Sequence, residues 1–283
     1  MATLFLVSTP IGNLDDLSPR AAATLCAVGR ILAEDTRRSR VLAERAGATA
    51  PMASLHAHNE RERVGRVLSW LEEGIDVALV SDAGTPLVSD PGARLVAAVW
   101  DAGHRVVPVP GPSAVLAALV ASGLPAEAFT FLGFAERKGG ARRRLVERVA
   151  VARETVVLFE SPNRLVALLE DLSEACEPQR RVAVARELTK IHEEMTRGTL
   201  AEAASYYRER PPKGEVTLVV APAAADASDA ERRQEDARAL ASELFEAGSR
   251  PSEIAREVAN RLGLARNEAY RIVHAVGGED TDE

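Results

Sequence analysis

Three short segments, each rich in Gly, Pro and small hydroxyl residues, carry the clearest chemical signal in the sequence. They are Ser8–Leu14, Ser81–Pro86 with its continuation Ser89–Gly92, and Pro110–Ala114. Gly lets a backbone approach a ligand closely, and Pro fixes a turn before the ligand binds. Backbone amides and Ser or Thr hydroxyls would then hydrogen-bond a polar ligand without adding net charge. Taken singly, each segment is also typical of a tight turn between a strand and a helix.

Charged residues close to two predicted strand ends are candidates for proton transfer. Glu34 and Asp35 follow the apolar run Arg30–Ala33, and Glu187 and Lys190 follow a second such run. These groups could accept a proton from a weakly acidic hydroxyl or stabilise its alkoxide. The alternative for Glu34 and Asp35 is that they favour a helix start. The alternative for Glu187 and Lys190 is a solvated ion pair that contributes little energy.

Basic residues gather in one segment, Arg137–Arg144, and its two central glycines would let it follow a phosphate backbone. Several cations on one loop give an affinity for nucleic acid that depends strongly on salt. The alternative is a helix start whose charges face solvent. The predicted phosphate-binding residues are Arg137, Lys138, Arg142, Arg143 and Arg144.

The elements that would position these residues alternate between short apolar strands and helices. The first part of the chain predicts strands at Thr3–Ser8, Arg30–Ala33, Met52–Leu55, Val77–Val80 and Arg105–Val109. It predicts helices at Pro19–Val28, Thr36–Ala46, Glu60–Glu73 and Pro91–Ala102. This alternation indicates a parallel sheet covered by helices on both faces. The three Gly- and Pro-rich segments then share the strand-end edge where such sheets bind ligands, which favours binding over simple turns.

A second α/β unit is predicted after the break Gly123–Pro125. Its strands are expected at Phe129–Phe134, Thr155–Phe159, Arg181–Ala185 and Glu215–Val220, with Glu193–Arg197 as a short strand returning beside the third. Its helices are expected at Ala141–Val151, Arg164–Ala175 and Leu200–Arg208. Because the alternation is less regular here, the sequence indicates a mixed sheet.

The C-terminal part predicts helices only. Pro222–Ser228 has the composition of a linker, and helices are expected at Asp229–Ala247, Pro251–Leu262 and Arg266–Val276. The last two helices flank a tight turn with a glycine, which is the outline of a helix-turn-helix. The predicted domains are therefore residues 1–122, 123–222 and 229–276, followed by an acidic, disordered tail at 277–283.

Length and composition agree with two α/β domains and a small appendage, because the chain has 283 residues with 46% hydrophobic and 27% charged side chains. No apolar run is long enough to predict a membrane span, and no signal peptide is predicted. Cys26 and Cys176 lie far apart and predict reduced thiols, so we expect a soluble, cytoplasmic protein. The net charge of −7 argues only weakly against nucleic acid, since the basic residues are clustered.

Six segments, in this order along the chain, resemble one known family. They are Ser8–Leu14, Ala33–Arg37, His56–Glu60, Ser81–Pro86, Pro110–Ala114 and Ala185–Lys190. They are similar to the tetrapyrrole methylase superfamily and, within it, to the ribosomal RNA small subunit methyltransferase I group. The superfamily often carries GxGxGD after its first strand, whereas Thr9–Leu14 keeps one glycine. This departure is typical of the ribosomal RNA group and disfavours a porphyrin substrate.

The resemblance implies two class III methyltransferase domains with a C-terminal helix-turn-helix-like domain. It also implies S-adenosyl-L-methionine as cofactor, a homodimer, and 2′-O-methylation of a cytidine ribose in the 16S ribosomal RNA of the 30S subunit. The implied cofactor contacts are Pro10, Ile11, Gly12, Asp82, Ala83, Gly84, Thr85, Pro110, Gly111, Pro112, Ser113, Ala114, Leu132 and Phe159. Ser113 is the expected hydroxyl contact. For Leu132 and Phe159, a plain core position is the alternative.

RNA contacts beyond the basic segment are expected at Arg37, His56 and Asn59. His56 and His58 point to the same face of a strand, but no third ligand of suitable spacing accompanies them, so no metal is predicted. A turn-forming role is the alternative for this segment. The candidate catalytic residues remain Glu34, Asp35, Glu187 and Lys190.

Two other functions remain open from the sequence. The helix-turn-helix outline is typical of a DNA-binding regulator, in which Arg256, Arg261, Arg266 and Arg271 would contact DNA. A methylase acting on a corrin precursor or a diphthamide precursor would use the same cofactor segments. The complete set of cofactor segments disfavours the regulator, and the basic segment with the added helices disfavours the other methylases.

Overall fold

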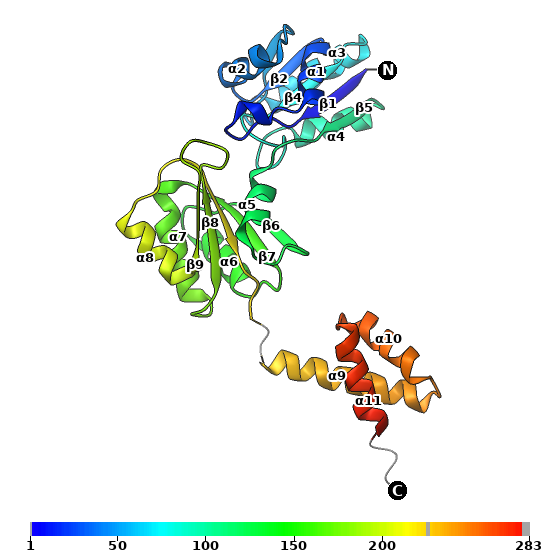
Figure 1. The fold of residues 1–283 in the computed structure, drawn as a ribbon. Helices are drawn as coiled ribbons and strands as arrows, with labels where there is room; N and C mark the ends of the chain where they lie inside the picture. Colours follow the sequence, from blue (N-terminus) through cyan, green and yellow to red (C-terminus); the bar gives the residue numbers. More distant parts are fainter. Residues whose placement is uncertain (1, 225–226, 279–283) are drawn as a thin grey trace. The chain divides into compact units, whose positions relative to one another are not determined.

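The computed structural model describes residues 2–224 and 227–278, and among these the side chains of 227–233 and 278 are left out. Contacts between residues divide the chain into two units, Met1–Ala223 and Ala224–Glu283. The first unit holds two α/β sheets, and the second is helical (Figure 1).

The first sheet has five parallel strands in the order β3-β2-β4-β1-β5. The strands are β1 Thr3–Val7, β2 Arg30–Ala33, β3 Met52–Ser54, β4 Val77–Val80 and β5 Arg105–Val109. All five were predicted within one residue at each end. The carboxyl ends of parallel strands meet at one edge, and the segments that follow β1, β4 and β5 therefore begin there.

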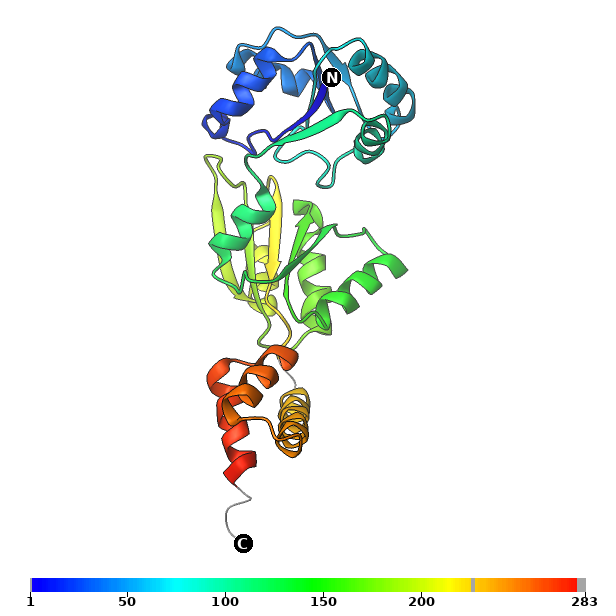
Figure 2. The same cartoon turned by 90° about the vertical axis from the view of Figure 1, so that its right-hand side faces the viewer.

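Helices cover both faces of this sheet, as predicted, because successive strand residues point to opposite sides. Helices α1 Pro19–Ala27 and α2 Thr36–Ala46 pack on the face that includes Val7 and Ile31. Helices α3 Glu60–Glu72 and α4 Ala93–Asp101 pack on the face that includes Leu4 and Leu32. In Figure 2 the blue helices and the cyan-to-teal helices lie on opposite sides of the sheet.

The second sheet is mixed, in the order β6-β7-β10-β8-β9. Its strands are β6 Phe129–Phe134, β7 Thr155–Glu160, β8 Arg181–Arg186, β9 Glu194–Thr199 and β10 Val216–Val220. β6 and β7 are parallel, whereas β10 is antiparallel to both β7 and β8, and β9 is antiparallel to β8. β10 therefore brings the end of β8 beside residues that lie 30 positions later in the chain.

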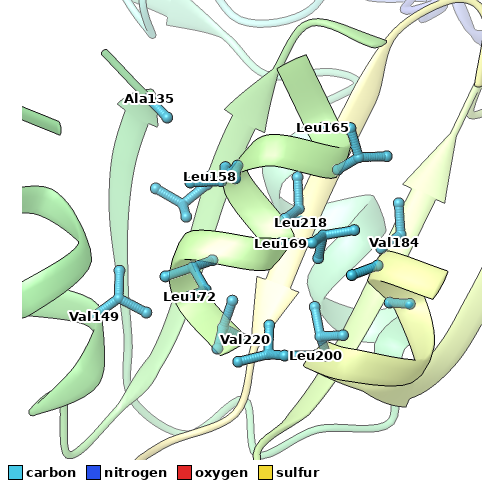
Figure 3. Close-up of a cluster of buried hydrophobic side chains, with 14 of the residues drawn as sticks. Ala135, Val149, Leu158, Leu165, Leu169, Leu172, Val184, Leu200, Leu218 and Val220 are labelled. Carbon is cyan, nitrogen blue, oxygen red and sulfur yellow. The ribbon is translucent and has the colours of Figure 1, made fainter. Parts of the chain in front are cut away.

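Four helices pack on the second sheet, three of them on one face. α6 Gly140–Ala150, α7 Pro162–Ala175 and α8 Leu200–Glu209 cover a core of aliphatic side chains shown in Figure 3. A capping box between Thr199 and Glu202 begins α8, in which each side chain accepts a hydrogen bond from the other residue's backbone N–H.

The fourth helix, α5 Ala114–Ser122, was not predicted, because its sequence is apolar all round and has no helical periodicity. It packs on the opposite face of the second sheet through Val115, Ala118 and Leu119. α5 therefore packs with the second sheet, although the sequence placed it before the domain boundary, which was predicted after residue 122. The segment Pro110–Ser113 is the point at which the chain passes from one sheet to the other.

The second unit consists of α9 Ala227–Glu246, α10 Pro251–Leu262 and α11 Arg266–Gly278 around a small core. Gly263 ends α10 in the left-handed conformation, with φ of 62°. α9 begins inside the predicted linker, of which residues 225–226 lie outside the described residues. α11 extends two residues beyond its predicted end, and residues 279–283 of the expected tail are not among the described residues. No helix of the described chain is long and apolar enough to cross a membrane.

Candidate active site

The three Gly- and Pro-rich segments are bonded to one another at the strand-end edge of the first sheet. Thr9 and Gly84 exchange backbone hydrogen bonds of 2.8 and 3.1 Å. The Ser8 hydroxyl donates to Oγ1 of Thr85 at 3.3 Å, and the Thr85 hydroxyl donates to the carbonyl oxygen of Pro112 at 3.2 Å. The segments therefore form one continuous backbone layer.

Two glycines allow this close approach. Gly84 has a φ of +82°, and a Cβ there would lie 3.2 Å from Cγ2 of Ile11. A Cβ at Gly111 would lie 3.0 Å from Cβ of Ser8. Larger residues would push the segments apart, so the layer depends on both positions.

The hydroxyl groups of this layer bond mostly within the protein. Ser113, predicted as a hydroxyl contact, is the N-cap of α5 and accepts the backbone N–H of Leu116 at 3.5 Å. α5 therefore begins at the layer, and the dipole at its N-terminus favours a negatively charged ligand group nearby.

The segment after Pro86 is backbone-strained and touches the second sheet. Leu87 and Ser89 have φ of +70° and +68°, a conformation that costs energy for residues with a Cβ. Ser89 Oγ lies 3.4 Å from the point where Gly133 of β6 would carry a Cβ. Strain of this kind persists where the surrounding structure enforces it, and it is frequent at ligand sites.

The two cofactor candidates of the second sheet have core partners. Phe159 packs against the rings of Phe131 and Phe134, with centroids 4.9 and 5.3 Å away. Leu132 packs against the aliphatic core beneath α6, α7 and α8. Packing alone accounts for both side chains, which agrees with the alternative interpretation of these positions.

The first segment also rests on the turn that follows β8. The backbone N–H of Asn13 donates to Oγ1 of Thr189 at 3.0 Å, and a Cβ at Gly12 would lie 2.4 Å from Cγ of Lys190. Glu187 and Thr189 both have positive φ, of 51° and 66°. The glycine kept in the first segment is thus what allows this turn to approach.

Lys190 is held between two carboxylates in this turn. Its Nζ lies 2.8 Å from Oε1 of Glu187 and 3.1 Å from Oε2 of Glu215. Oε1 of Glu187 also accepts the backbone N–H of Glu215 at 2.9 Å. Gly214 has a φ of +83°, and a Cβ there would overlap the Glu187 carboxylate.

The charges of this cluster fix its protonation. The hydrogen bond from Lys190 and then that from the Glu215 backbone lower the pKa of Glu187. Partial burial opposes the charge of Lys190, but its hydrogen bonds to the two carboxylates outweigh burial and raise its pKa. Lys190 is therefore a persistent cation, and Glu187 is its counter-ion.

A cavity of about 260 Å³ lies between the first segment, α2 and this cluster. Its walls include Ile11, Gly12, Arg38, Asp82 and Lys190. A second hollow of about 860 Å³ shares Gly12 and Lys190 with it. Arg38, which belongs to a group of basic residues near the start of the chain but was not among the predicted site residues, also borders the cavity and pairs with Asp82. Its position in the first turn of a helix that follows a strand end was the available signal.

Asp82 joins the end of β2 to the segment after β4. Its two oxygens accept the backbone N–H of Asp35 at 3.0 Å and Nη1 of Arg38 at 3.2 Å. Behind it, Glu34 and Asp90 line a closed pocket. Burial and the Asp82 charge raise the pKa of Glu34, whereas burial and the Glu34 charge raise the pKa of Asp90 to about 6.

Asp90 was missed as a candidate, although it lies in the same continued segment as Asp82. Nothing in its local sequence signals its partial burial, which arises where the loop returns over Glu34, Leu55 and Leu79.

Asp35 is engaged in capping. Its side chain is the N-cap of α2, accepts the Arg37 backbone N–H at 2.9 Å and forms an ion pair of 2.8 Å with the Arg37 guanidinium. The hydrogen bonds from Arg37 lower the pKa of Asp35 to about 2. This matches the alternative interpretation, a charge arrangement at a helix start, and such a carboxylate is a poor general base at neutral pH.

Comparison with known proteins identifies the family. Residues 3–204 match the family described as Tetrapyrrole (Corrin/Porphyrin) Methylases. The chain belongs to this family. The resemblance stated from its sequence segments is confirmed, and methyltransferases of this family use S-adenosyl-L-methionine.

Relatives of this tetrapyrrole methylase are similar to it over most of their length. A Synechocystis protein named Ribosomal RNA small subunit methyltransferase I is 43% identical over 96% of this chain and 97% of its own length. Proteins of the same name from Mesorhizobium japonicum and Mycobacterium tuberculosis are 45% and 51% identical. They cover 95% and 78% of this chain, and 90% and 78% of their own lengths.

Solved structures confirm the fold of this tetrapyrrole methylase. A Thermus thermophilus uroporphyrin-III-C-methyltransferase has a TM-score of 0.57 and 23% identity, covering 78% of this chain and 94% of its own. The methyltransferase CobJ has a TM-score of 0.61 and 23% identity, covering 79% and 95%. At this identity the likeness concerns the fold alone.

One predicted RNA contact of this methylase is corrected by the structure. The side chain of Arg142 is only 8% exposed, and its guanidinium pairs with Asp171 at 2.5 Å and with Glu160 at 3.8 Å. Arg142 lies one turn before Val146 on the buried side of α6, so it faces the core rather than solvent. Exposed cations of the same segment remain, namely Arg137, Lys138, Arg143 and Arg144.

The structure gives Asn59 and His56, two other predicted RNA contacts, hydrogen bonds within the protein. The Asn59 side chain accepts the His56 backbone N–H at 2.8 Å and donates to the Ser54 carbonyl at 3.2 Å. Its polar atoms therefore form a turn, which was the alternative interpretation. Arg37 is 89% exposed but is already paired with Asp35.

Proposed function

We propose that the protein transfers a methyl group from S-adenosyl-L-methionine to the 2′-oxygen of a cytidine ribose in 16S ribosomal RNA, expected at C1402, within the 30S subunit. The observation that carries the proposal is the 43% identity, along 96% of the chain, to a protein named for methylation of small-subunit ribosomal RNA. The bonded layer of three segments supports the cofactor, and Lys190 offers the adjoining cavity an ammonium group held in place by two carboxylates.

The residues present fit the cofactor. The layer Thr9–Gly12, Asp82–Thr85 and Pro110–Ala114 exposes backbone groups at glycines that leave no room for side chains. Its amides at the α5 N-terminus suit the carboxylate of a methionine moiety. When bound, S-adenosyl-L-methionine supplies an electrophilic methyl carbon on a positively charged sulfur.

Lys190 is the residue best placed to assist the acceptor. When bound, S-adenosyl-L-methionine would donate the methyl group to the 2′-oxygen and keep the electron pair of the broken carbon–sulfur bond, and the hydroxyl proton would pass to solvent. A permanent ammonium group stabilises the negative charge that develops on the oxygen. Glu187 positions Lys190 rather than acting as the base, because its lowered pKa makes it a weak acceptor.

Exposed cations in and just before α6 would hold the RNA backbone. Arg137, Lys138 and Arg143 lie at a hollow of about 550 Å³ between α6 and α7. Its other walls carry the acidic residues Glu147, Asp171 and Glu174. Cations that neutralise phosphates release counter-ions, and the affinity for RNA should therefore fall steeply with salt.

The test is methyl transfer from labelled S-adenosyl-L-methionine to purified 30S subunits and to naked 16S RNA. We expect faster incorporation into the 30S subunit, with nucleoside mass spectrometry identifying 2′-O-methylcytidine. Label found on a base rather than a ribose would contradict the proposed position. Absence of label from RNA in both substrates would reject the function.

We further propose that two copies associate. One side of α5 packs on the second sheet, and the other exposes Leu116 and Val120 by 52% and 73%. Exposed aliphatic side chains one turn apart suit a second copy of the chain. Sedimentation equilibrium should give twice the mass of one chain, and a monomer at micromolar concentration would contradict this.

A further inference from the structure

Helix α11 presents one polar, aromatic side that the proposed function does not use. Its exposed residues are Arg266, Asn267, Tyr270, Arg271 and His274, which we call the α11 face. Their spacing of one, three and four positions places them along one side of a helix. The residues between them, Ala269, Ile272 and Val273, fill the core of the helical unit.

The α11 face combines two rings with two cations. The rings of Tyr270 and His274 lie 4.4 Å apart, and Tyr270 is 52% exposed. Arg266 and Arg271 are exposed on either side of Tyr270 in the sequence. Glu268, the one acidic residue in Arg266–Gly278, is half-buried and lies off this face. An exposed tyrosine that packs on no core needs another explanation.

The arginines of α10 and α11 differ in their ion pairing. On α10, Arg261 pairs with Glu257 at 2.7 Å, one turn away. Within the described part of the chain, Arg266 and Arg271 form no such pair. Arg266 and Arg271 are thus available to an external anion, as is the exposed Arg256 of α10. Arg261, by contrast, already has an acidic partner at the surface.

We propose that the α11 face binds RNA, with Tyr270 and His274 stacking on unpaired bases and Arg266 and Arg271 contacting phosphates. The inference rests on the proposed RNA substrate and adds a second contact surface, carried by a separate helical unit. Aromatic rings accept any base, because every base has a stacking face. Unstacked bases are common in RNA loops and rare in duplex DNA.

The position of the rings favours RNA over duplex DNA. In a helix-turn-helix, residues at the start of the second helix reach the base edges of the major groove. Tyr270 is the fifth residue of α11 and His274 the ninth. A pair of flat rings there suits stacking on unpaired bases. Arg266 and Asn267, at the start of α11, are groups that can read base edges, so duplex DNA is compared directly in the experiment below.

The experiment measures binding of the full chain to a fluorescein-labelled hairpin RNA with an unpaired loop, by fluorescence anisotropy at several salt concentrations. Tyr270→Ala should weaken binding about 5- to 100-fold, as expected for the loss of one stacked base. The double variant Arg266→Gln/Arg271→Gln should reduce the slope of log affinity against log salt by about 1.4 to 1.8.

Matched controls separate this effect from a general loss of structure or charge. Trp100→Ala removes an aromatic side chain on α4 that is 60% exposed, and Arg261→Gln removes the paired cation of α10. Both should leave the affinity within about twofold of the unchanged protein. Circular dichroism melts of all variants should coincide, since every substituted side chain is exposed.

Three results would overturn the inference. The first is an unchanged affinity for the hairpin in Tyr270→Ala and in the double variant. The second is a larger loss for duplex DNA than for the hairpin, which would make α11 a DNA reader. The third is loss of self-association without loss of RNA affinity, which would make the face a protein contact.

The binding readout is independent of methyl transfer, so the two proposals can fail separately. If the unchanged protein methylates no RNA yet binds the hairpin through Tyr270, the enzymatic proposal fails and the α11 face stands. If the unchanged protein methylates 30S subunits and the α11 variants keep full affinity for the hairpin, the enzymatic proposal stands and the α11 face fails.

Discussion

Two glycines at the site occupy backbone conformations that a side chain would strain. Gly84 and Gly214 have φ of +82° and +83°, and each lies against another part of the site. At Gly84 the neighbour is the apolar Ile11, and at Gly214 it is the Glu187 carboxylate. A side chain at either position would therefore strain the backbone and displace the neighbouring group.

We expect Gly84→Ala to weaken S-adenosyl-L-methionine binding by about tenfold or more, because a strained residue costs about 1–3 kcal/mol and displaces Ile11. Isothermal titration calorimetry gives the affinity. Gly65→Ala is the matched control, since Gly65 lies within α3 with nothing within 4 Å of its Cβ position. Equal affinity in the two variants would remove the layer from the cofactor site.

Lys190→Met should lower kcat by about 10²- to 10³-fold, as loss of one charge-stabilising group does, while the affinity for the cofactor changes little. Glu187→Gln should lower kcat less, because Lys190 keeps its charge and its contact with Glu215. Lys213→Met serves as a control for charge. If Lys190→Met kept most of its kcat on 30S subunits, Lys190 would be structural.

The raised pKa of Asp90 predicts a pH-dependent stability. The folded protein binds this proton up to a pKa of about 6, whereas the unfolded chain releases it near 3.8. Stability from this group is therefore present below pH 4 and is lost as the pH rises towards and through 6. Asp90→Asn cannot lose a proton there.

Urea unfolding at pH 4, 5, 6 and 8 tests this directly. The stability of Asp90→Asn relative to the unchanged protein should increase with pH between 4 and 6 and level off above 7. A difference that is constant across this range would show that Asp90 titrates normally.

At the scale of elements, α6 shows how one helix divides a run of arginines between two roles. Arg142 shares the buried side with Val146 and Val149, whereas Arg143 and Arg144 face solvent. The helical rotation of 100° per residue decides which cation is buried. A run of like charges in the sequence contains no such distinction.

We expect Arg142→Ala to reduce the free energy of unfolding by about 1–3 kcal/mol, because it removes the partner of Asp171 and one of the two guanidinium groups beside the fully buried Glu160. Glu160 keeps its other partner, Arg164. Arg143→Ala should change stability by less than about 0.5 kcal/mol and should weaken RNA binding instead. Denaturant unfolding and RNA anisotropy on both variants give the comparison. Equal stability of the two variants would contradict the assignment.

At the scale of the whole molecule, every residue proposed for cofactor binding and catalysis lies in the first unit, Met1–Ala223. The helical unit has its own core. A chain ending after Ala223 should therefore keep its affinity for S-adenosyl-L-methionine and lose affinity for RNA by about tenfold or more. Calorimetry and anisotropy measure the two. Loss of both affinities would mean that the helical unit supports the fold of the first.

The sequence by itself predicted the elements that have strong local signals. Strands such as Val77–Val80 and helices such as Thr36–Ala46 have the periodicity and flanking residues of their class. Three loops at one sheet edge followed from parallel strands, because their carboxyl ends must coincide. α5 was missed because a helix apolar on all sides has no periodic pattern.

Only the tertiary structure decided which charged residues meet. Glu215 joins the local pair of Glu187 and Lys190 because β10 pairs between β7 and β8, an order that no local pattern specifies. Asp90 is half-buried by a returning loop, and Arg142 is buried by the rotation of its helix. Local preference acts over a few residues, whereas burial and charge pairing depend on strands far apart in the chain, so the protonation and the roles of the site residues are properties of the fold.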